Sequence, residues 1–327
     1  MGTTVGIPRA LAYHDYSPLW KAFLSNLGAE PVISPPTNQA IVNDGVGLAV
    51  DGTCLPVKIF YGHVSWLIEA GVDSIFLPRL ISVAPKEYIC PKFMGLPDMM
   101  AAAFPNRARF IAPVVNLTLS PRLFYRELEK VGQGLGCTAK ETRKAWDEAL
   151  AAQKRFQSFL QGGNWPAEYE AEQDRDTESM VTRPLDNPNL RIGLLGHSYV
   201  IYDKLASMDA VSRLHHMGAE VLTVDMLSPA RIEAQAVRWP KRMFWTSGRR
   251  ILGAAWEYTE MPVDGIIYIT AFGCGTDSLT AELVERTVRR RSQIPQLILN
   301  IDEHTGEAGV VTRLEAFVDM LRWRRAR

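Results

Sequence analysis

The hydrophobic positions in the first 120 residues follow two alternating patterns. Short apolar runs have the length of buried strands, whereas Ser17–Leu27 and Val57–Glu69 carry apolar side chains at the spacing of helices with one buried face. The strands are expected at Thr3–Gly6, Glu30–Ser34, Ser74–Leu77 and Arg109–Pro113. Strands that alternate with helices predict parallel βαβ units, and therefore an α/β fold.

The pattern changes after residue 120. From Arg122 to Leu160 it is helical throughout, and Ala139–Phe159 is a long amphipathic segment. Residues 162–190 are polar, acidic and rich in Pro and Asn, which is typical of a surface linker, and strand-like runs resume at Leu190. We therefore expect an N-terminal α/β domain (1–120), a helical insert with a linker (121–189) and a C-terminal α/β domain (190–327).

The second α/β part repeats the first at an offset of about 190 residues. The matching segments are Val5-Gly6-Ile7 and Ile192-Gly193-Leu194, Gly28-Ala29-Glu30 and Gly218-Ala219-Glu220, and Gly71–Phe76 and Pro262–Ile267. Each part has a cysteine after its last matching segment, Cys90 or Cys274. The repeat predicts two similar Rossmann-like domains with open parallel sheets. Because such sheets bind ligands beyond the carboxyl ends of their strands, we expect a site in the cleft between the domains.

The four cysteines are scattered, and no secretory context is visible, so we expect reduced thiols rather than disulfides. Cys90 and Cys274 follow equivalent strands and should face one cleft. Cys54 lies in a loop that enters a helix, where the helix dipole favours a thiolate. Three converging thiolates suit a cubane iron–sulfur cluster with one iron open, and Cys137 lies apart in the helical insert. The alternative is three buried cysteines that only pack.

Other metal and nucleophile chemistry has less support in the sequence. The six histidines show no spacing typical of a zinc site. A nucleophilic Cys54 would need a base, but His63 lies about two and a half turns farther along the same predicted helix. The chain contains no phosphate-binding loop, so we do not expect it to hydrolyse ATP itself.

Two loops at expected strand ends carry candidate acid–base groups. His197 and Tyr199 follow the first strand of the second part, where they could contact a substrate or make ordinary loop hydrogen bonds. Glu303 and His304 follow the apolar run Leu297–Ile301. They could supply acid–base groups or belong to the cap of a nearby helix, and the sequence leaves both interpretations open.

Composition narrows the range of partners. Lys plus Arg and Asp plus Glu are both 36, so no net charge attracts nucleic acid or an anionic membrane. No apolar run approaches the roughly 18 residues of a membrane span, and residues 1–30 show no targeting signal, which favours a cytoplasmic location. The basic tail Arg322–Arg327 fits the end of a helix.

Several separated motifs carry a resemblance over nearly the whole chain. They are Val5–Leu11, Pro18-Leu19-Trp20, Cys54–Lys58, Gly62-His63-Val64, Phe76–Arg79, Cys90-Pro91, Gly196–Tyr199, Phe272–Gly275, Ile301–Glu307 and Thr312–Phe317. With these motifs the chain resembles the acyl-CoA dehydratase activase-related proteins. That family is related to the subunits of 2-hydroxyacyl-CoA dehydratase and benzoyl-CoA reductase.

The resemblance implies Rossmann-like domains and a cluster bound by Cys54, Cys90 and Cys274. The cluster would be 4Fe-4S, or the double-cubane 8Fe-9S type of some relatives. The implied role is low-potential electron transfer or reduction, driven by a separate ATP-hydrolysing activase of the sugar kinase/Hsp70/actin type, and a homodimer is expected. Two alternatives stay open: a non-catalytic cluster carrier or scaffold that docks the activase, and a cluster-free protein that binds a small ligand.

Overall fold

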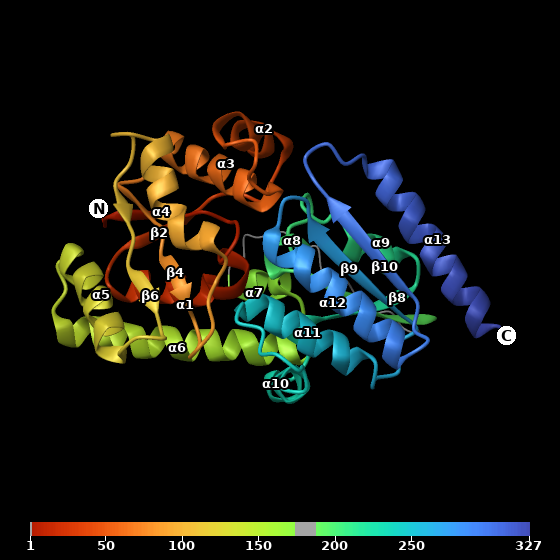
Figure 1. The fold of residues 1–327 in the computed structure, drawn as a ribbon. Helices are drawn as coiled ribbons and strands as arrows, with labels where there is room; N and C mark the ends of the chain where they lie inside the picture. Colours follow the sequence, from red (N-terminus) through yellow and green to blue (C-terminus); the bar gives the residue numbers. More distant parts are fainter. Residues whose placement is uncertain (1, 174–187) are drawn as a thin grey trace. The chain divides into compact units, whose positions relative to one another are not determined.

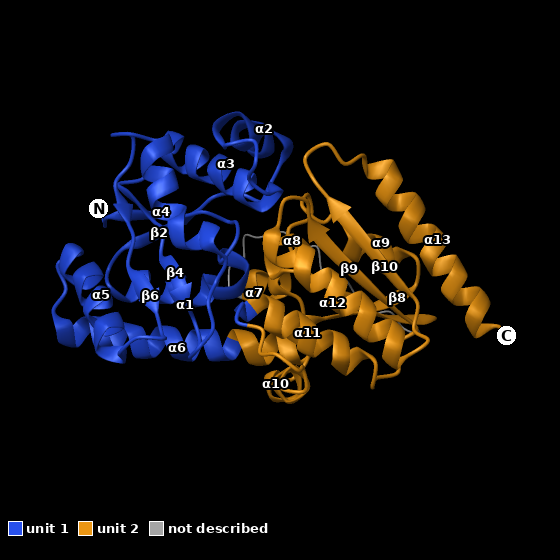
Figure 2. Ribbon diagram, in the orientation of Figure 1, with its two compact units in different colours: residues 1–155, 244–246 blue, residues 156–243, 247–327 orange. Residues whose placement is uncertain are grey.

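The computed structural model describes residues 2–173 and 188–327 (Figure 1). The chain forms two compact units, coloured separately in Figure 2. Unit 1 comprises Met1–Arg155 and Phe244–Thr246, and unit 2 comprises Phe156–Met243 and Ser247–Arg327. Each unit contains a four-stranded sheet of its own, so each is an α/β body in its own right.

The four-stranded sheet of unit 1 is parallel throughout and has the order β2-β1-β3-β5. Its strands are β1 (Thr4–Ile7), β2 (Glu30–Ile33), β3 (Ser74–Phe76) and β5 (Phe110–Ile111). β1 lies in the interior of the sheet, where Gly6 pairs with Val32 on one side and Ile75 on the other. The residues of β3 are all buried, as expected for an inner strand of a parallel sheet covered by helices.

The helices of unit 1 follow these strands in the order that βαβ units require. They are α1 (Tyr13–Asn26), α2 (Gln39–Leu48), α3 (Leu55–Glu69), α4 (Pro91–Ala103), α5 (Pro121–Gly134) and α6 (Ala139–Gln161), the last of which ends in unit 2. Strands β4 (Arg79–Ser82) and β6 (Val114–Asn116) form a separate parallel pair. Nearly all of α3 is buried, including Lys58 and His63, so this helix is central to the unit.

The sheet of unit 2 follows the same path as that of unit 1. Its parallel strands are β7 (Leu190–Leu195), β8 (Ala219–Thr223), β9 (Gly265–Ala271) and β10 (Gln296–Ile301), in the order β10-β9-β7-β8. The first strand again lies between the second and the third, and the fourth is at the edge. Every residue of β9 is buried. The two sheets therefore have one topology, as the sequence repeat predicts.

The remaining elements follow α6 in the chain. They are α7 (Pro166–Gln173), α8 (Ser198–Ile201), α9 (Ala210–His216), η1 (Val224–Met226), α10 (Pro229–Ala236), α11 (Thr246–Tyr258), α12 (Gly275–Arg291) and α13 (Glu307–Arg325). The basic tail is the end of α13, as predicted. There Arg322 donates to the carbonyl of Met217 at 2.6 Å and Arg324 to that of Gln293 at 3.0 Å.

A close helix crossing occurs in the same place in both units. In unit 1, a Cβ on Gly62 of α3 would lie 1.9 Å from the carbonyl oxygen of Ile41 in α2. In unit 2, a Cβ on Gly253 of α11 would lie 2.3 Å from the carbonyl oxygen of Ile232 in α10. Real Cβ atoms do not approach so closely, so only glycine permits either crossing. This shared detail supports the duplication more directly than the strand order does.

The predicted α/β class with parallel sheets is confirmed, while some local expectations differ from the structure. The strand expected over Arg109–Pro113 is limited to Phe110–Ile111, and helix α2 was not expected. Part of the segment 162–190, taken as a linker, forms α7, and residues 174–187 of it lie outside the described residues. The domain boundaries at 120 and 189 stay a prediction.

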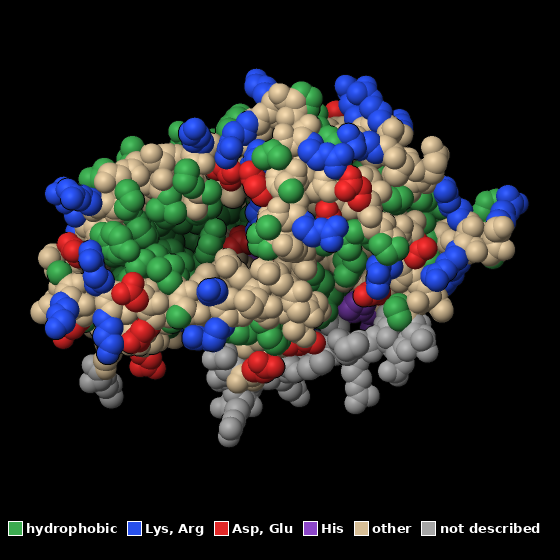
Figure 3. Space-filling model, turned by 90° about the horizontal axis from the view of Figure 1, so that it is seen from below, with side chains coloured by type: hydrophobic (Ala, Val, Ile, Leu, Met, Phe, Trp, Pro, Cys, Tyr) green, Lys and Arg blue, Asp and Glu red, His purple; other side chains and the backbone are tan. Residues whose placement is uncertain are grey.

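The surface agrees with the balanced composition. On the face in Figure 3, Lys and Arg side chains are interspersed with Asp and Glu side chains. Within the described residues, no helix is long and apolar enough to cross a membrane.

Candidate metal centre

Cys54, Cys90 and Cys274 occupy one and the same local position, the N-cap of a helix. Cys54 precedes α3, Cys90 precedes α4 and Cys274 precedes α12. Each carbonyl accepts a hydrogen bond from the first helical turn, for example Cys274 from the N–H of Ser278 at 3.0 Å. Each of these cysteines therefore lies at the positive end of a helix, where the N–H groups of the first turn have no partner within the helix.

The residues that follow these cysteines explain why the helices begin there. Pro56 and Pro91 occupy the first turns of α3 and α4, where a missing N–H costs nothing and the fixed φ suits a helix. Cys274 is reached from β9 through Gly273, whose φ of +76° is easily adopted by glycine alone. Cys54 and Cys274 are buried, and Cys90 is partly buried.

Cys137 has a different setting. It lies in the connection between α5 and α6, and its thiol donates to the carbonyl of Leu27 at 3.4 Å. It begins no helix, so it lacks the feature that the other three share. None of the four cysteines forms a disulfide bond in the structure, as the sequence predicts.

Cys274 belongs to a buried group of three possible metal ligands. The Nε2 of His197, the Sγ of Cys274 and a carboxylate oxygen of Asp277 all lie within 4.8 Å of one another. Nε2 of His197 is 3.0 Å from Oδ1 of Asp277 and 3.9 Å from the sulfur. His197 follows β7, whereas Cys274 and Asp277 follow β9. All three are at most 8% exposed.

The strand order explains this meeting of distant residues. From β7 the chain proceeds to β8, which pairs with one edge of β7, and later to β9, which pairs with the other edge. The loops after β7 and β9 therefore diverge at their carboxyl ends, which is the switch point where open α/β sheets bind ligands. His197 and Cys274 thus lie at the carboxyl ends of two neighbouring strands within unit 2.

Further contacts fix the group. Tyr268 of β9 donates its hydroxyl to Oδ1 of Asp277 at 2.8 Å, and Thr276 Oγ1 lies 3.2 Å from the sulfur of Cys274. The ring of Tyr199 stacks on that of His197, with centroids 4.7 Å apart and planes 9° apart. Tyr199 therefore supports His197 by packing.

The electrostatics of His197 follow from its neighbours. Burial by itself lowers the pKa of His197, but the Asp277 carboxylate and the Cys274 sulfur outweigh it and hold that pKa well above its ordinary value. Burial, reinforced by Asp277, raises the pKa of Tyr268 well above its ordinary value. Both Asp277 and Cys274 face the same ring nitrogen of His197. A nucleophile–base–carboxylate relay requires opposite nitrogens, so this geometry does not form one.

The other predicted candidates lie elsewhere. His304 is mostly exposed and its ring nitrogen is 3.8 Å from the carboxylate of Glu303. The loop that holds them is organised by Asp302, whose carboxylate accepts from the backbone N–H of His304 and from the hydroxyl of Thr305. These two residues do not form part of the buried His197–Cys274–Asp277 group.

The sequence interpretation missed Asp277 and Tyr268. The signal for Asp277 was its place three residues after Cys274, which puts both at the start of one helix. Tyr268 gave no comparable signal. His63, considered as a base for Cys54, is instead engaged on both nitrogens: Nδ1 is 2.9 Å from the hydroxyl of Ser34 and Nε2 is 3.0 Å from that of Thr37.

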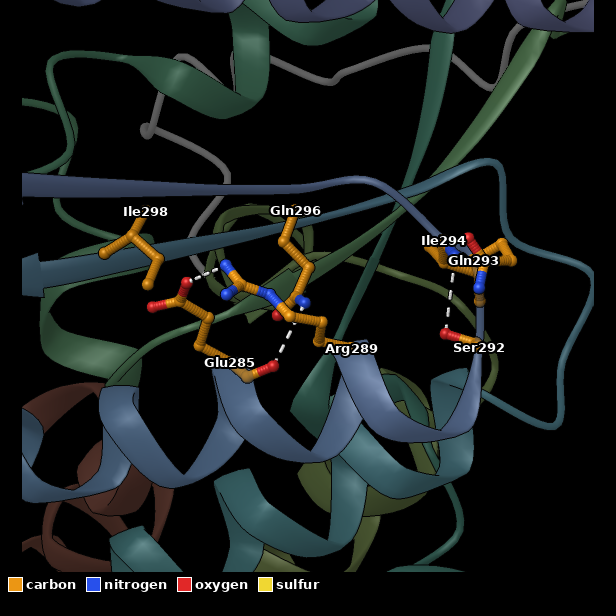
Figure 4. Close-up of a pocket in the computed structure, with 7 residues that line it drawn as sticks. All are labelled: Glu285, Arg289, Ser292, Gln293, Ile294, Gln296 and Ile298. Atoms are coloured by element: carbon orange, nitrogen blue, oxygen red, sulfur yellow. Dashed lines mark hydrogen bonds and ion pairs between the residues drawn. The ribbon is translucent and has the colours of Figure 1, made fainter.

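Two pockets lie outside the His197–Cys274–Asp277 group. A surface pocket of about 490 Å³ lies between α12 and β10 (Figure 4), but Glu285 and Arg289 in its wall form an ion pair with each other. A second cavity, of about 30 Å³, lies in unit 1 where the loops after β1 and β3 diverge, and its lining is apolar. That volume holds about one water, so the cavity is too small for a substrate.

The fold and the position of the three cysteines define a class of protein, a parallel α/β protein with cysteines at the starts of three of its helices. Comparison with known families makes this specific. The model of the CoA enzyme activase uncharacterised domain (DUF2229) matches residues 4–227, and that of the 2-hydroxyglutaryl-CoA dehydratase D-component matches residues 230–321. The chain therefore belongs to the activase-related dehydratase family, as its motifs indicate. No curated protein matches it.

Proposed function

We propose that this chain is an iron–sulfur protein with Cys54, Cys90 and Cys274 as cluster ligands. The observation that carries the proposal is their common position at helix N-caps, which Cys137 does not share. The family matches add support, because Cys54 and Cys90 fall in the activase-domain match and Cys274 in the dehydratase match. Thiolates are the usual protein ligands of iron–sulfur clusters.

The donor set fits such a group. Three cysteines leave one iron of a 4Fe-4S cluster open, and a double-cubane 8Fe-9S cluster is the variant to test against it. When bound, the cluster would supply one-electron reduction at low potential. The chain contributes three thiolates, the N–H groups of three helix starts, and burial around Cys54 and Cys274. These are the features through which a protein tunes the potential of a cluster.

We further propose that the electron comes from a separate ATP-hydrolysing activase of the sugar kinase/Hsp70/actin type. The support is the activase name of the matched family. A cytoplasmic homodimer completes the proposal. Turnover of a small acyl substrate with activase, ATP and reductant would distinguish a reductase or dehydratase component from a cluster carrier.

The test is iron and acid-labile sulfide per chain, with the absorption spectrum, on protein prepared without oxygen. About four irons indicate one cubane and about eight a double cubane. Cys54→Ala, Cys90→Ala and Cys274→Ala should each lose or convert the cluster, whereas the matched control Cys137→Ala should keep its spectrum. Unchanged spectra in the first three variants, or no iron after anaerobic reconstitution, would overturn the proposal.

A further inference from the structure

We propose that unit 2 by itself binds a divalent transition-metal ion through His197, Cys274 and Asp277. This site needs neither Cys54 nor Cys90, so it differs from the cluster site and shares only Cys274 with it. The three donors come from the loop after β7 and the start of α12, both in unit 2. Each is buried, and their ligand atoms lie within 4.8 Å of one another.

The distances suit one shared ion. In a tetrahedral zinc site, Zn–S near 2.3 Å and Zn–N near 2.0–2.1 Å place neighbouring donor atoms about 3.4–3.6 Å apart. Here Nε2 of His197 is 3.0 Å from Oδ1 of Asp277 and 3.9 Å from Sγ of Cys274. Both differ from the expected separation by less than about half an ångström. Small side-chain rotations would bring all three donors onto one ion.

An unsatisfied oxygen points to the same conclusion. Oδ2 of Asp277 is buried and has no hydrogen-bond partner among the described residues, although Asp277 is only 2% exposed. A buried carboxylate oxygen without a partner is unfavourable, and it is uncommon in native proteins. A cation held by His197 and Cys274 and bound by both oxygens of Asp277 would give Oδ2 a partner.

Neighbouring side chains hold the three donor residues in place, as residues around the ligands do in known metal sites. Tyr268 donates to Oδ1 of Asp277 at 2.8 Å, and so orients the carboxylate. Tyr199 holds the plane of the His197 ring by stacking. Outer contacts of this kind fix the orientation of ligands in known sites.

The donor chemistry selects the kind of ion. One thiolate, one imidazole and one carboxylate suit Zn²⁺ or Fe²⁺, whereas Mg²⁺ and Ca²⁺ prefer oxygen donors alone. Three protein ligands leave a fourth tetrahedral position open, which is the arrangement of catalytic rather than structural zinc sites. The site therefore suits an ion that also binds water or a small anionic ligand.

The experiment uses Co²⁺ as a spectroscopic substitute for Zn²⁺, added to metal-free full-length protein. In the double variant Cys54→Ser/Cys90→Ser, we expect a single Co²⁺ per chain with a thiolate-to-cobalt charge-transfer band, displaced by Zn²⁺. Adding Cys274→Ser should abolish the band. Tyr268→Phe, which removes an outer contact, should weaken Zn²⁺ binding roughly 10- to 100-fold, and Asp277→Asn or His197→Gln by more than that.

The design separates this proposal from the cluster proposal, because the double variant lacks two cluster ligands. A band that persists after Cys274→Ser, or that is absent in the double variant but present in the wild type, would overturn the site. If the double variant does not fold, single substitutions in the wild type decide: Cys274→Ser must remove the band, and neither Cys54→Ser nor Cys90→Ser may do so. Cys137→Ser is the matched control.

Discussion

The two units share a scaffold and differ in the chemistry placed on it. Both have the same strand order and the same glycine-dependent helix crossing. At the start of the second crossing helix, however, α3 is preceded by Cys54, whereas α11 of unit 2 is preceded by Trp245, a residue of unit 1. After the third strand, Cys274 directly begins a helix, whereas β4 intervenes before Cys90. Duplication thus preserved the packing, while the residues at the helix starts diverged.

The environments of the thiols differ as well. In unit 2, Cys274 has a buried imidazole and a buried carboxylate within reach, and no comparable group occurs among the described residues of unit 1. Unit 1 instead has two cysteines at helix N-cap positions. A site assembled from unit 1 alone would therefore be rich in sulfur, whereas one in unit 2 is mixed. Mixed and all-sulfur donor sets favour different metals.

The largest expected effect of a single substitution tests the shared scaffold. Gly62→Ala and Gly253→Ala each force a Cβ against a backbone carbonyl, so each should cost about 3 kcal/mol or more in the free energy of unfolding, at or above the usual range for overpacking. Gly62→Ala should cost more, because its approach is closer, 1.9 Å against 2.3 Å. Denaturant unfolding of the purified variants measures both.

Gly47→Ala is the matched control. It lies in α2, and a Cβ there would meet no atom within 4 Å. The substitution should stabilise by about 0.5–1 kcal/mol, because alanine favours helix over glycine. Equal effects for Gly47→Ala and Gly62→Ala would contradict the crossing as described.

The second prediction concerns acid. Burial, followed by the charges of His14 and Arg9, lowers the pKa of His63 to about 3, and burial followed by the charge of Arg9 does the same for His14. Below pH 6.5 the unfolded chain therefore binds more protons than folded unit 1. Unit 1 should lose up to about 1.4 kcal/mol per pH unit for each histidine as the pH falls from about 6.5 towards 3.

Unit 2 should respond differently to the same change. In the metal-free protein, the raised pKa of His197 contributes stability that is fully present below about pH 6.5 and is lost as the pH rises through its folded value. His215 changes the stability of unit 2 in the opposite direction, because burial and then the charge of His216 lower the pKa of His215. Amide hydrogen exchange measured at pH 7 and pH 5 should show that the lower pH reduces the protection of unit 1 more than that of unit 2. His63→Gln should reduce the acid slope of unit 1, and the exposed His304→Gln should leave it unchanged.

The smallest expected effect compares single hydrogen bonds. Ser34→Ala in unit 1 removes the partner of His63 Nδ1 and of the Arg9 N–H, and should cost about 1–3 kcal/mol. Tyr268→Phe in unit 2 should lower the free energy of unfolding by about 1 kcal/mol, because Oδ1 of Asp277 still has Nε2 of His197 as a partner. Thermal or denaturant unfolding distinguishes them, and a larger cost for Tyr268→Phe would reverse the expected order.

The features of the fold that could be predicted from the sequence are those that depend on local residue patterns. The parallel α/β class, the repeat and the strand-end position of Cys274 all follow from periodicity and matching segments. Helix α2 could not be predicted in this way, since its glycine-rich sequence has low helix propensity and it packs closely on α3 through Gly45. Asp277 and His197 meet only because β7 and β9 are neighbours in the sheet.

A three-residue segment has a consequence for how this protein can be divided. Phe244–Thr246 belongs to unit 1, where the N–H of Tyr88 donates to the carbonyl of Phe244 at 2.7 Å and the N–H of Thr246 donates to that of Tyr88 at 3.0 Å. The chain thus passes between the units at 155, 243 and 246. No single cut releases both units intact. A fragment that ends at Arg155 would lose Phe244–Thr246, and with it both hydrogen bonds to the backbone of Tyr88, just before Cys90. Although the two units share one strand order, neither is a single continuous stretch of the chain.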